Sequence, residues 1–298
     1  MSTPEATLNP PGPNIALRRP YTLSPKPNYP HCTDSGDGSQ LTDGKYVKGY
    51  FWVQKGCVGW RKAPLVTITI DLGRVEPISG LSFSTAAGVA GVYWPRAILV
   101  MVSEDGKNFY FVGDLVGLSA RSSPPPREGY ATHKFVTDGL KTKGRFVRLV
   151  VIPSGAYTFC DEIEIYGGPT ELLRQPLRGE KVTDIHAFVD ALKTDLEARR
   201  RMLQDIEAME RIVKGSPLPK GRKRRLLLLL ASLRREVDSM PRIRPEGFKA
   251  VLPFNDLHAR ILAVNAEVLR ARGFPPLLAW HKCRWDPLLP WEAPETPP

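Results

Sequence analysis

The sequence predicts a mainly β protein: a jelly-roll β-sandwich over residues 21–168, a helical hairpin over 169–240 and a short C-terminal β region over 241–298. Short β-rich runs with frequent turn signals are typical of a sandwich. After Gly167-Gly168-Pro169 the hydrophobic period changes from two residues to helical spacing. Residues 1–20, which carry several prolines and no hydrophobic period, are expected to form a flexible tail.

The strands of the first region are recognised by their alternation. In residues 65–73, Val66, Ile68 and Ile70 alternate with polar side chains, which is the pattern of a half-buried strand. The runs 98–102 and 146–152 are almost wholly apolar, so we expect strands buried on both faces.

Two helices are expected after the sandwich. From Thr183, a candidate N-cap, apolar residues recur at helical spacing up to Val213, and residues 215–219 break the pattern. A second helix is expected from about 222 to 239, packed on the first as an antiparallel hairpin. We expect four residues of the first helix to be buried against 226–233: Leu192, Leu196, Leu203 and Ile206.

The C-terminal region is interpreted as β structure. Residues 258–270 alternate loosely, and 276–285 resemble a second strand. Two strands cannot bury a sheet face alone, so this region either packs on the rest of the chain or begins a further domain of a longer protein.

The chain is basic, with a formal net charge of +11 over 298 residues. Its densest basic run, 220–225, indicates either a polyanion patch or localisation signal, or the solvated first turn of a helix. We favour the helical turn and expect no nucleic-acid partner, because no nucleic-acid motif accompanies the run. No apolar stretch approaches the ~20 residues of a membrane span, and no signal-peptide pattern is visible at the start.

Motifs for catalysis are missing from the sequence. It contains no Gly-x-Ser-x-Gly elbow, phosphate loop, CxxC or HExxH pattern, and its five histidines are scattered. Asp161 and Glu162 are adjacent on an expected strand, so they point to opposite faces and cannot act as a glycosidase pair. We therefore expect no catalytic residues in this chain.

Residues 32–44 and 159–167, with the β-rich runs between them, resemble the discoidin (coagulation-factor type C) family and its relatives among carbohydrate-binding modules. The resemblance covers about half of the chain and implies a discoidin-like, galactose-binding-like sandwich that binds rather than catalyses. The run 280–288 also resembles segments that follow an N-terminal binding module in large bacterial polysaccharide-degrading proteins.

The resemblance implies a structural calcium ion that ties the loop after the first strand to the last strand. Glu162 and an acid of the loop would be its ligands, and the candidates are Asp34, Asp37 and Asp43. Calcium prefers six to eight oxygen ligands, which such a loop supplies as carboxylates and carbonyls. The alternative is that Asp43-Gly44 forms a turn and Glu162 lies at the surface.

Aromatic residues beside glycines and prolines form the candidate glycan site. Sugars offer C–H faces to aromatic rings and hydroxyls to arginine donors. The alternative for the tryptophans is a place in the core. The predicted ligand-binding residues are Trp60, Arg61, Trp94, Arg96, Tyr157 and Phe159.

These features favour a non-catalytic module that binds a glycan or polysaccharide, as part of a secreted bacterial polysaccharide-active protein that is extracellular or periplasmic. The alternatives are a protein–protein or cell-surface adhesion module, and the N-terminal part of a glycoside hydrolase whose catalytic part lies outside this chain. Cys32 and Cys160 flank the two halves of the site, so they either form a disulfide or remain buried thiols.

Overall fold

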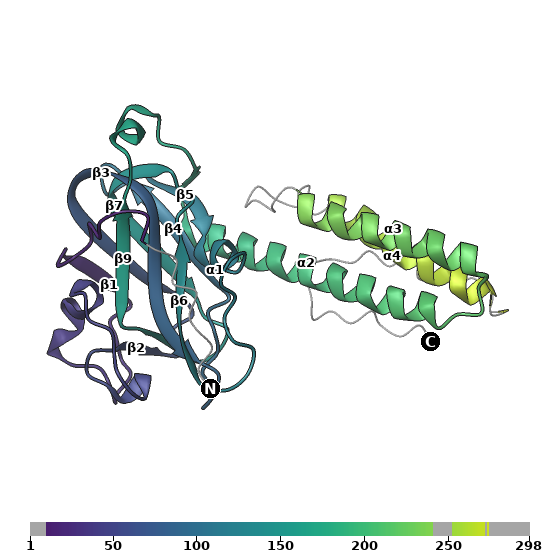
Figure 1. Cartoon of the computed structure of the whole chain (residues 1–298), viewed down its shortest axis with the longest axis horizontal. Coiled ribbons are helices and arrows are strands. Elements are labelled where there is room, and N and C mark those ends of the chain that lie inside the picture. Colours follow the sequence, from purple (N-terminus) through teal and green to yellow (C-terminus); the bar gives the residue numbers. More distant parts are fainter. Residues whose placement is uncertain (1–9, 241–251, 272, 274–298) are drawn as a thin grey trace. The chain divides into compact units, whose positions relative to one another are not determined.

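The computed structural model describes residues 10–240, 252–271 and 273. Its contacts divide the chain into two compact units that meet between Thr183 and Asp184 (Figure 1). The part up to Thr183 is called the β unit and the part from Asp184 the helical unit.

From residue 10 to Thr183, the described part of the β unit contains ten strands, one short α-helix and four 3₁₀ turns. The strands are β1 Tyr21–Ser24, β2 Val58–Arg61, β3 Val66–Ala87, β4 Ala97–Ser103, β5 Phe109–Asp114, β6 Ala131–Thr137, β7 Thr142–Ile152, β8 Tyr157–Cys160, β9 Glu162–Gly167 and β10 Glu180–Val182. The helical pieces are η1 Ser35–Gly38, η2 Gln40–Thr42, η3 Phe51–Val53, α1 Leu115–Ser119 and η4 Thr170–Arg174.

One long strand, β3, belongs to both layers of the sandwich. Its first part pairs with β1 and β7, and the sheet continues through β4 and β5 to β10. After a register shift between Asp71 and Glu76, its second part pairs with β9 and β6. Every pairing is antiparallel, so the predicted β-sandwich is confirmed.

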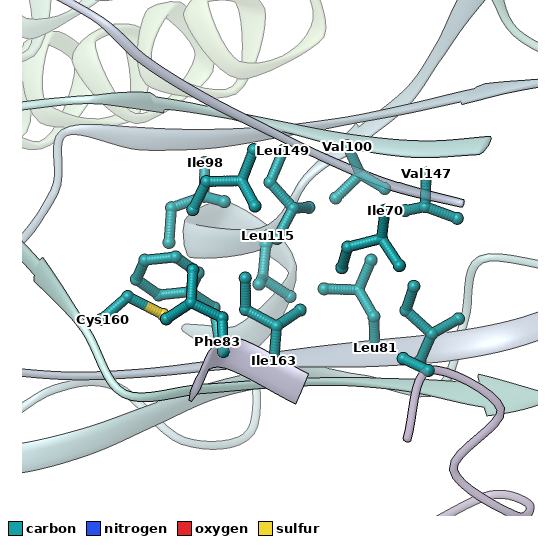
Figure 2. Packing of buried hydrophobic residues seen from close by; sticks show 14 of the residues in the cluster. Ile70, Leu81, Phe83, Ile98, Val100, Leu115, Val147, Leu149, Cys160 and Ile163 are labelled. Carbon is teal, nitrogen blue, oxygen red and sulfur yellow. The ribbon is translucent and has the colours of Figure 1, made fainter. Parts of the chain in front are cut away.

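The core lies between these layers. Figure 2 shows Ile70, Val100 and Leu149 on one side of the core and Phe83 and Ile163 on the other. The alternation read from the sequence is confirmed, because Val66, Ile68 and Ile70 are fully buried while the residues between them are only half-buried. All seven residues of β4 are buried, as its apolar run predicts.

The helical unit is a three-helix arrangement of α2 Ile185–Lys214, α3 Lys220–Ser239 and α4 Leu252–Ala271. The predicted α2–α3 hairpin is confirmed, with Asp184 instead of Thr183 as the N-cap: its Oδ1 accepts from the backbone N–H groups of His186 (2.8 Å) and Ala187 (3.0 Å). The shared core consists of Ala198, Met202, Ile206, Met209, Val213, Leu226, Leu230, Leu233, Val237, Phe254, Leu257, Ile261, Val264 and Val268.

The expected packing stripe of α2 is only partly right. Ile206 is fully buried in the core shared with α3, but Leu196 and Leu203 are half-buried, and Leu192 is buried outside that core. The stripe is shifted toward Ala198 and Met202 because α2 packs against α4 as well as α3.

The predicted C-terminal β region is wrong over residues 258–270, which belong to α4. The buried apolar residues of this stretch recur every three or four positions, which places them on one face of a helix. The second expected strand, 276–285, lies outside the described residues. Among the helices that the structure describes, none is long and apolar enough to cross a membrane.

Candidate functional site

The candidate site begins at the small sheet formed by β2 and β8. In this antiparallel pair Arg61 lies opposite Tyr157 and Gly59 opposite Phe159, while Trp60 lies opposite Thr158. Successive side chains of a strand point to opposite faces. Trp60 therefore enters the sandwich core, and Arg61, Tyr157 and Phe159 share the outer face.

Aromatic rings cover this outer face. Tyr29 meets Phe159 edge-on at 4.8 Å and Tyr157 at 5.7 Å between ring centroids, and Trp52 stacks on Phe159 at 5.5 Å. Aromatic pairs at these separations stabilise one another beyond simple burial. Position 59 must be glycine for this packing, because a Cβ there would lie 2.7 Å from the Phe159 ring.

Three loops meet beside Tyr157, and their residues Arg61, Lys62, Tyr93, Arg96 and Tyr157 are called the loop site. The backbone N–H of Lys62 donates to the Ala156 carbonyl at 2.6 Å, and that of Arg96 donates to the Ile152 carbonyl at 2.9 Å. The Tyr93 ring lies against Gly155, where a Cβ would come within 2.7 Å of it. Tyr93 is 61% exposed, so the loop site offers an open ring beside a row of cations.

The six predicted ligand-binding residues separate into two groups. Arg61 and Arg96 are exposed and Tyr157 is half-buried, so these three can reach a ligand. Trp60 is fully buried and its indole N–H donates to the Pro25 carbonyl at 2.8 Å; Phe159 is also buried. Both are core residues, which corrects their assignment as ligand contacts.

Trp94 is half-buried, and its indole N–H donates to the Pro126 carbonyl at 2.9 Å. Its ring packs edge-on against His133 and Phe135. The exposed aromatic of this loop is the neighbouring Tyr93, which was not among the predicted ligand-binding residues. The signal was present, because Tyr93 belongs to the same Tyr-Trp-Pro segment.

The loop expected to bind calcium holds its acids in different ways. Asp34 caps η1, with its Oδ1 accepting from the Gly36 N–H at 2.7 Å and from the Gln40 side-chain amide at 3.2 Å. Asp43 Oδ1 accepts from the Lys45 N–H at 2.8 Å. Asp37 is buried with an Oδ1 that has no hydrogen-bond partner, and burial raises the pKa of its carboxyl.

Glu162 is a buried acid whose carboxylate a bound cation would stabilise. It is fully buried at the start of β9; its Oε2 accepts from the Gly44 N–H at 3.1 Å, and its Oε1 has no partner. The pKa of Glu162 is raised to about 8, mainly by burial and to a lesser extent by the nearby charge of Asp43. The hydrogen bond from Gly44 opposes this rise. Glu162 is thus linked to the loop by the hydrogen bond from Gly44, and the calcium ion expected to make this link stays a prediction.

The side chains around Glu162 provide only some of the ligands that a bound cation would need. Among the described residues, no three His, Cys, Asp or Glu side chains gather closely enough to hold a metal. The four predicted carboxylates therefore do not surround one point. The unpaired Glu162 oxygen, with Asp43 nearby, is nevertheless a hard anionic ligand of the kind that calcium prefers, and loop carbonyls would have to supply most other ligands.

A hollow of about 340 Å³ opens beside the same loop. Its lining includes Asp43 together with Lys45, Lys48 and Lys55. Lys55 donates to the Thr33 carbonyl at 3.3 Å, which ties the wall of the hollow to the loop.

Cys32 and Cys160 are both free thiols in this structure, as is Cys57, and all three are buried. Cys32 lies on the outer face of β2, where a Cβ on Gly59 would be 2.7 Å from its sulfur. Cys160 lies on the inner face opposite Val58 and belongs to the sandwich core. The two thiols therefore approach the small sheet from opposite faces, and the disulfide between them is not formed.

Residues 28–163 match the family model of the F5/8 type C domain. The match spans a little under half of the chain. It confirms the resemblance read from the sequence.

Similar solved structures include CpGH89CBM32-5 of Clostridium perfringens in complex with GalNAc-β-1,3-galactose (17% identity, 49% of this chain and 94% of that chain, TM-score 0.34). A chitosan-binding module of a chitosanase/glucanase from Paenibacillus sp. IK-5 has 17% identity over 52% of this chain and 99% of that chain, with a TM-score of 0.33. A fucose binding module of Streptococcus pneumoniae has 17% identity over 53% of this chain and 99% of that chain, with a TM-score of 0.34. No curated protein sequence matched this chain.

Proposed function

We propose that the β unit is a non-catalytic glycan-binding module and that the loop site is its binding surface. The observation that carries this proposal is the pairing of Arg61 with Tyr157 across β2 and β8, with the exposed Tyr93 ring against Gly155, two residues before Tyr157. An aromatic ring accepts the C–H face of a sugar, and a guanidinium donates to neighbouring hydroxyls. The discoidin-like domain supports a binding role.

The aromatic rings behind the loop site would act as a rigid support. Tyr29 and Phe159 pack on Tyr157, and Trp52 packs on Phe159, so the Tyr157 ring loses little freedom when a ligand binds. Preorganised contact residues lower the entropic cost of association. Module and parent protein would act outside the cytoplasm, in a secreted bacterial polysaccharide-active protein with further domains.

A structural calcium ion at Glu162 is the second part of the proposal. The ion would be held by the unpaired Oε1 of Glu162 and by oxygens of the loop that contains Asp43 and Gly44. Bound there, it would supply positive charge to a buried carboxylate and tie the loop to β9. The glycan-binding residues make no use of it.

Binding of the full chain to an array of neutral and charged glycans tests the main proposal. Tyr93→Ala is expected to weaken the binding of a positive glycan by about tenfold or more, because a central aromatic contact contributes roughly 1–3 kcal/mol. Tyr110→Ala is the matched control, because Tyr110 pairs with Val102 near the far end of β4. Silence on every glycan, with retained binding to a protein partner, would favour the adhesion alternative.

A further inference from the structure

The charges of the loop site are of one sign. Arg61, Lys62 and Arg96 are exposed, and none of them has an ion-pair partner among the described residues. The segments that form the site, 61–64, 91–96 and 153–157, contain no acidic residue. By contrast, Arg145 is paired with Asp71 at 2.8 Å and Lys134 with Glu164 at 2.5 Å.

The surrounding segments extend this imbalance. Asn28 connects the segment that carries Lys26 to the site, since its side-chain amide donates to the Arg61 carbonyl at 3.1 Å and its Oδ1 accepts from the Arg61 N–H at 2.7 Å. On the other side, the Pro126 carbonyl accepts from Trp94, and the next two residues are Arg127 and Glu128. Glu128 is the single acid of this border, whereas Lys26 and Arg127 add two cations.

A neutral sugar does not need a group of unpaired positive charges in its binding site. Hydroxyls are satisfied by one or two neutral or cationic donors, whereas several exposed cations without acidic neighbours favour an anionic ligand. Arginine forms paired hydrogen bonds with carboxylate and sulfate-like groups, and these bonds are about twice as strong as neutral ones.

We propose that the ligand of the loop site is an anionic polysaccharide, in which a carboxylate or sulfate group binds Arg61 and Lys62 while a sugar ring stacks on Tyr93. This inference rests on the proposed glycan-binding function and adds the charge class of the ligand. Arg96 lies three residues after Tyr93, on the same loop, and would contact the next charged sugar along the chain.

The test compares polygalacturonate with the same polymer after methyl esterification, which keeps the backbone and removes the charge. Binding of the full-length chain to each polymer is measured at about 50 and about 200 mM salt. We expect clear binding of polygalacturonate, at least about tenfold weaker binding of the ester, and a marked loss of affinity at the higher salt. Chondroitin sulfate and its desulfated form provide the same comparison for sulfate groups.

Charge variants locate the anion. Arg61→Gln and Lys62→Gln should each weaken binding several-fold, and melting curves check that these exposed substitutions leave the fold intact. Lys107→Gln is the matched control: Lys107 is exposed in the turn after β4, about 20 Å of strand away from Arg96, and should change binding less than twofold. Lys48→Gln tests the lysine-lined hollow as a competing anion site.

The outcomes are separable. Equal binding of the charged and esterified polymers, with both lost in Tyr93→Ala, would leave the glycan-binding function standing and overturn the anionic class. Equal losses in Lys107→Gln and Arg61→Gln would show unspecific attraction to a basic protein and would overturn it too. A loss confined to Lys48→Gln would place the anion in the hollow, against the loop site. No binding of any polymer would count against both proposals.

Discussion

Replacing Glu162 by glutamine is expected to remove a pH dependence from the stability of the β unit. The pKa of Glu162 is 4.5 in its ordinary range and about 8 in the folded protein, mainly because the carboxyl is buried. Between these values the unfolded chain has released the proton and the folded chain retains it. In the absence of metal, the free energy of unfolding must therefore fall as pH rises from 4.5 to about 8. The contribution of Glu162 to that free energy is largest below pH 4.5.

The size of the effect follows from the separation of the two pKa values. Each unit corresponds to about 1.4 kcal/mol, so the complete window amounts to roughly 4–5 kcal/mol as an upper bound. Bound calcium would hold the carboxylate ionised and flatten the curve. At a calcium concentration a hundred times its dissociation constant, it would add about 2.7 kcal/mol.

Urea unfolding of the wild type and of Glu162→Gln between pH 5 and 8, with EDTA or with calcium, measures both effects. The difference between the two proteins isolates Glu162 from Asp161, whose pKa is also raised by burial. We expect a falling stability for the wild type in EDTA, a flatter curve for the variant, and calcium stabilisation in the wild type only. Parallel curves in EDTA would refute the raised pKa, and a wild type indifferent to calcium would refute the metal site.

Three further results are expected. Trp60→Ala should cost about 3–5 kcal/mol of stability in urea unfolding and leave the affinity per folded molecule unchanged; a loss of affinity alone would return Trp60 to the binding surface. Ile206→Ala should destabilise the helical unit by about 2–5 kcal/mol and the half-buried Leu203→Ala by clearly less, as followed by helical circular dichroism; a reversed order would contradict the shifted stripe of α2. The buried thiols of Cys32, Cys57 and Cys160 should not react with an aromatic disulfide reagent until the protein is unfolded. A disulfide between any two of them in the native protein would contradict the structure.

Much of the fold could be predicted because its strands are marked by local patterns. The alternation around Ile68 and the apolar run of β4 each report burial directly. The C-terminal helix could not be predicted because residues 258–270 fit a loose strand-like alternation, although Leu257, Ile261, Val264 and Val268 also recur at helical spacing. A short apolar pattern can fit either a strand or a helix, and the packing partner decides between the two.

The alternation of side chains along β2 explains why only some of the residues predicted to bind a ligand lie on an accessible face. The sequence shows Trp60 and Arg61 as neighbours, but neighbours on a strand face opposite ways, so a buried Trp60 requires an exposed Arg61. Arg61 lies opposite Tyr157 and not opposite Thr158 because of the register between β2 and β8, which the sequence does not show. A tryptophan–arginine pair in a strand thus indicates one core residue and one surface residue. The residue opposite the arginine must come from another chain segment, and here Tyr157 lies opposite Arg61 in the β2–β8 pair.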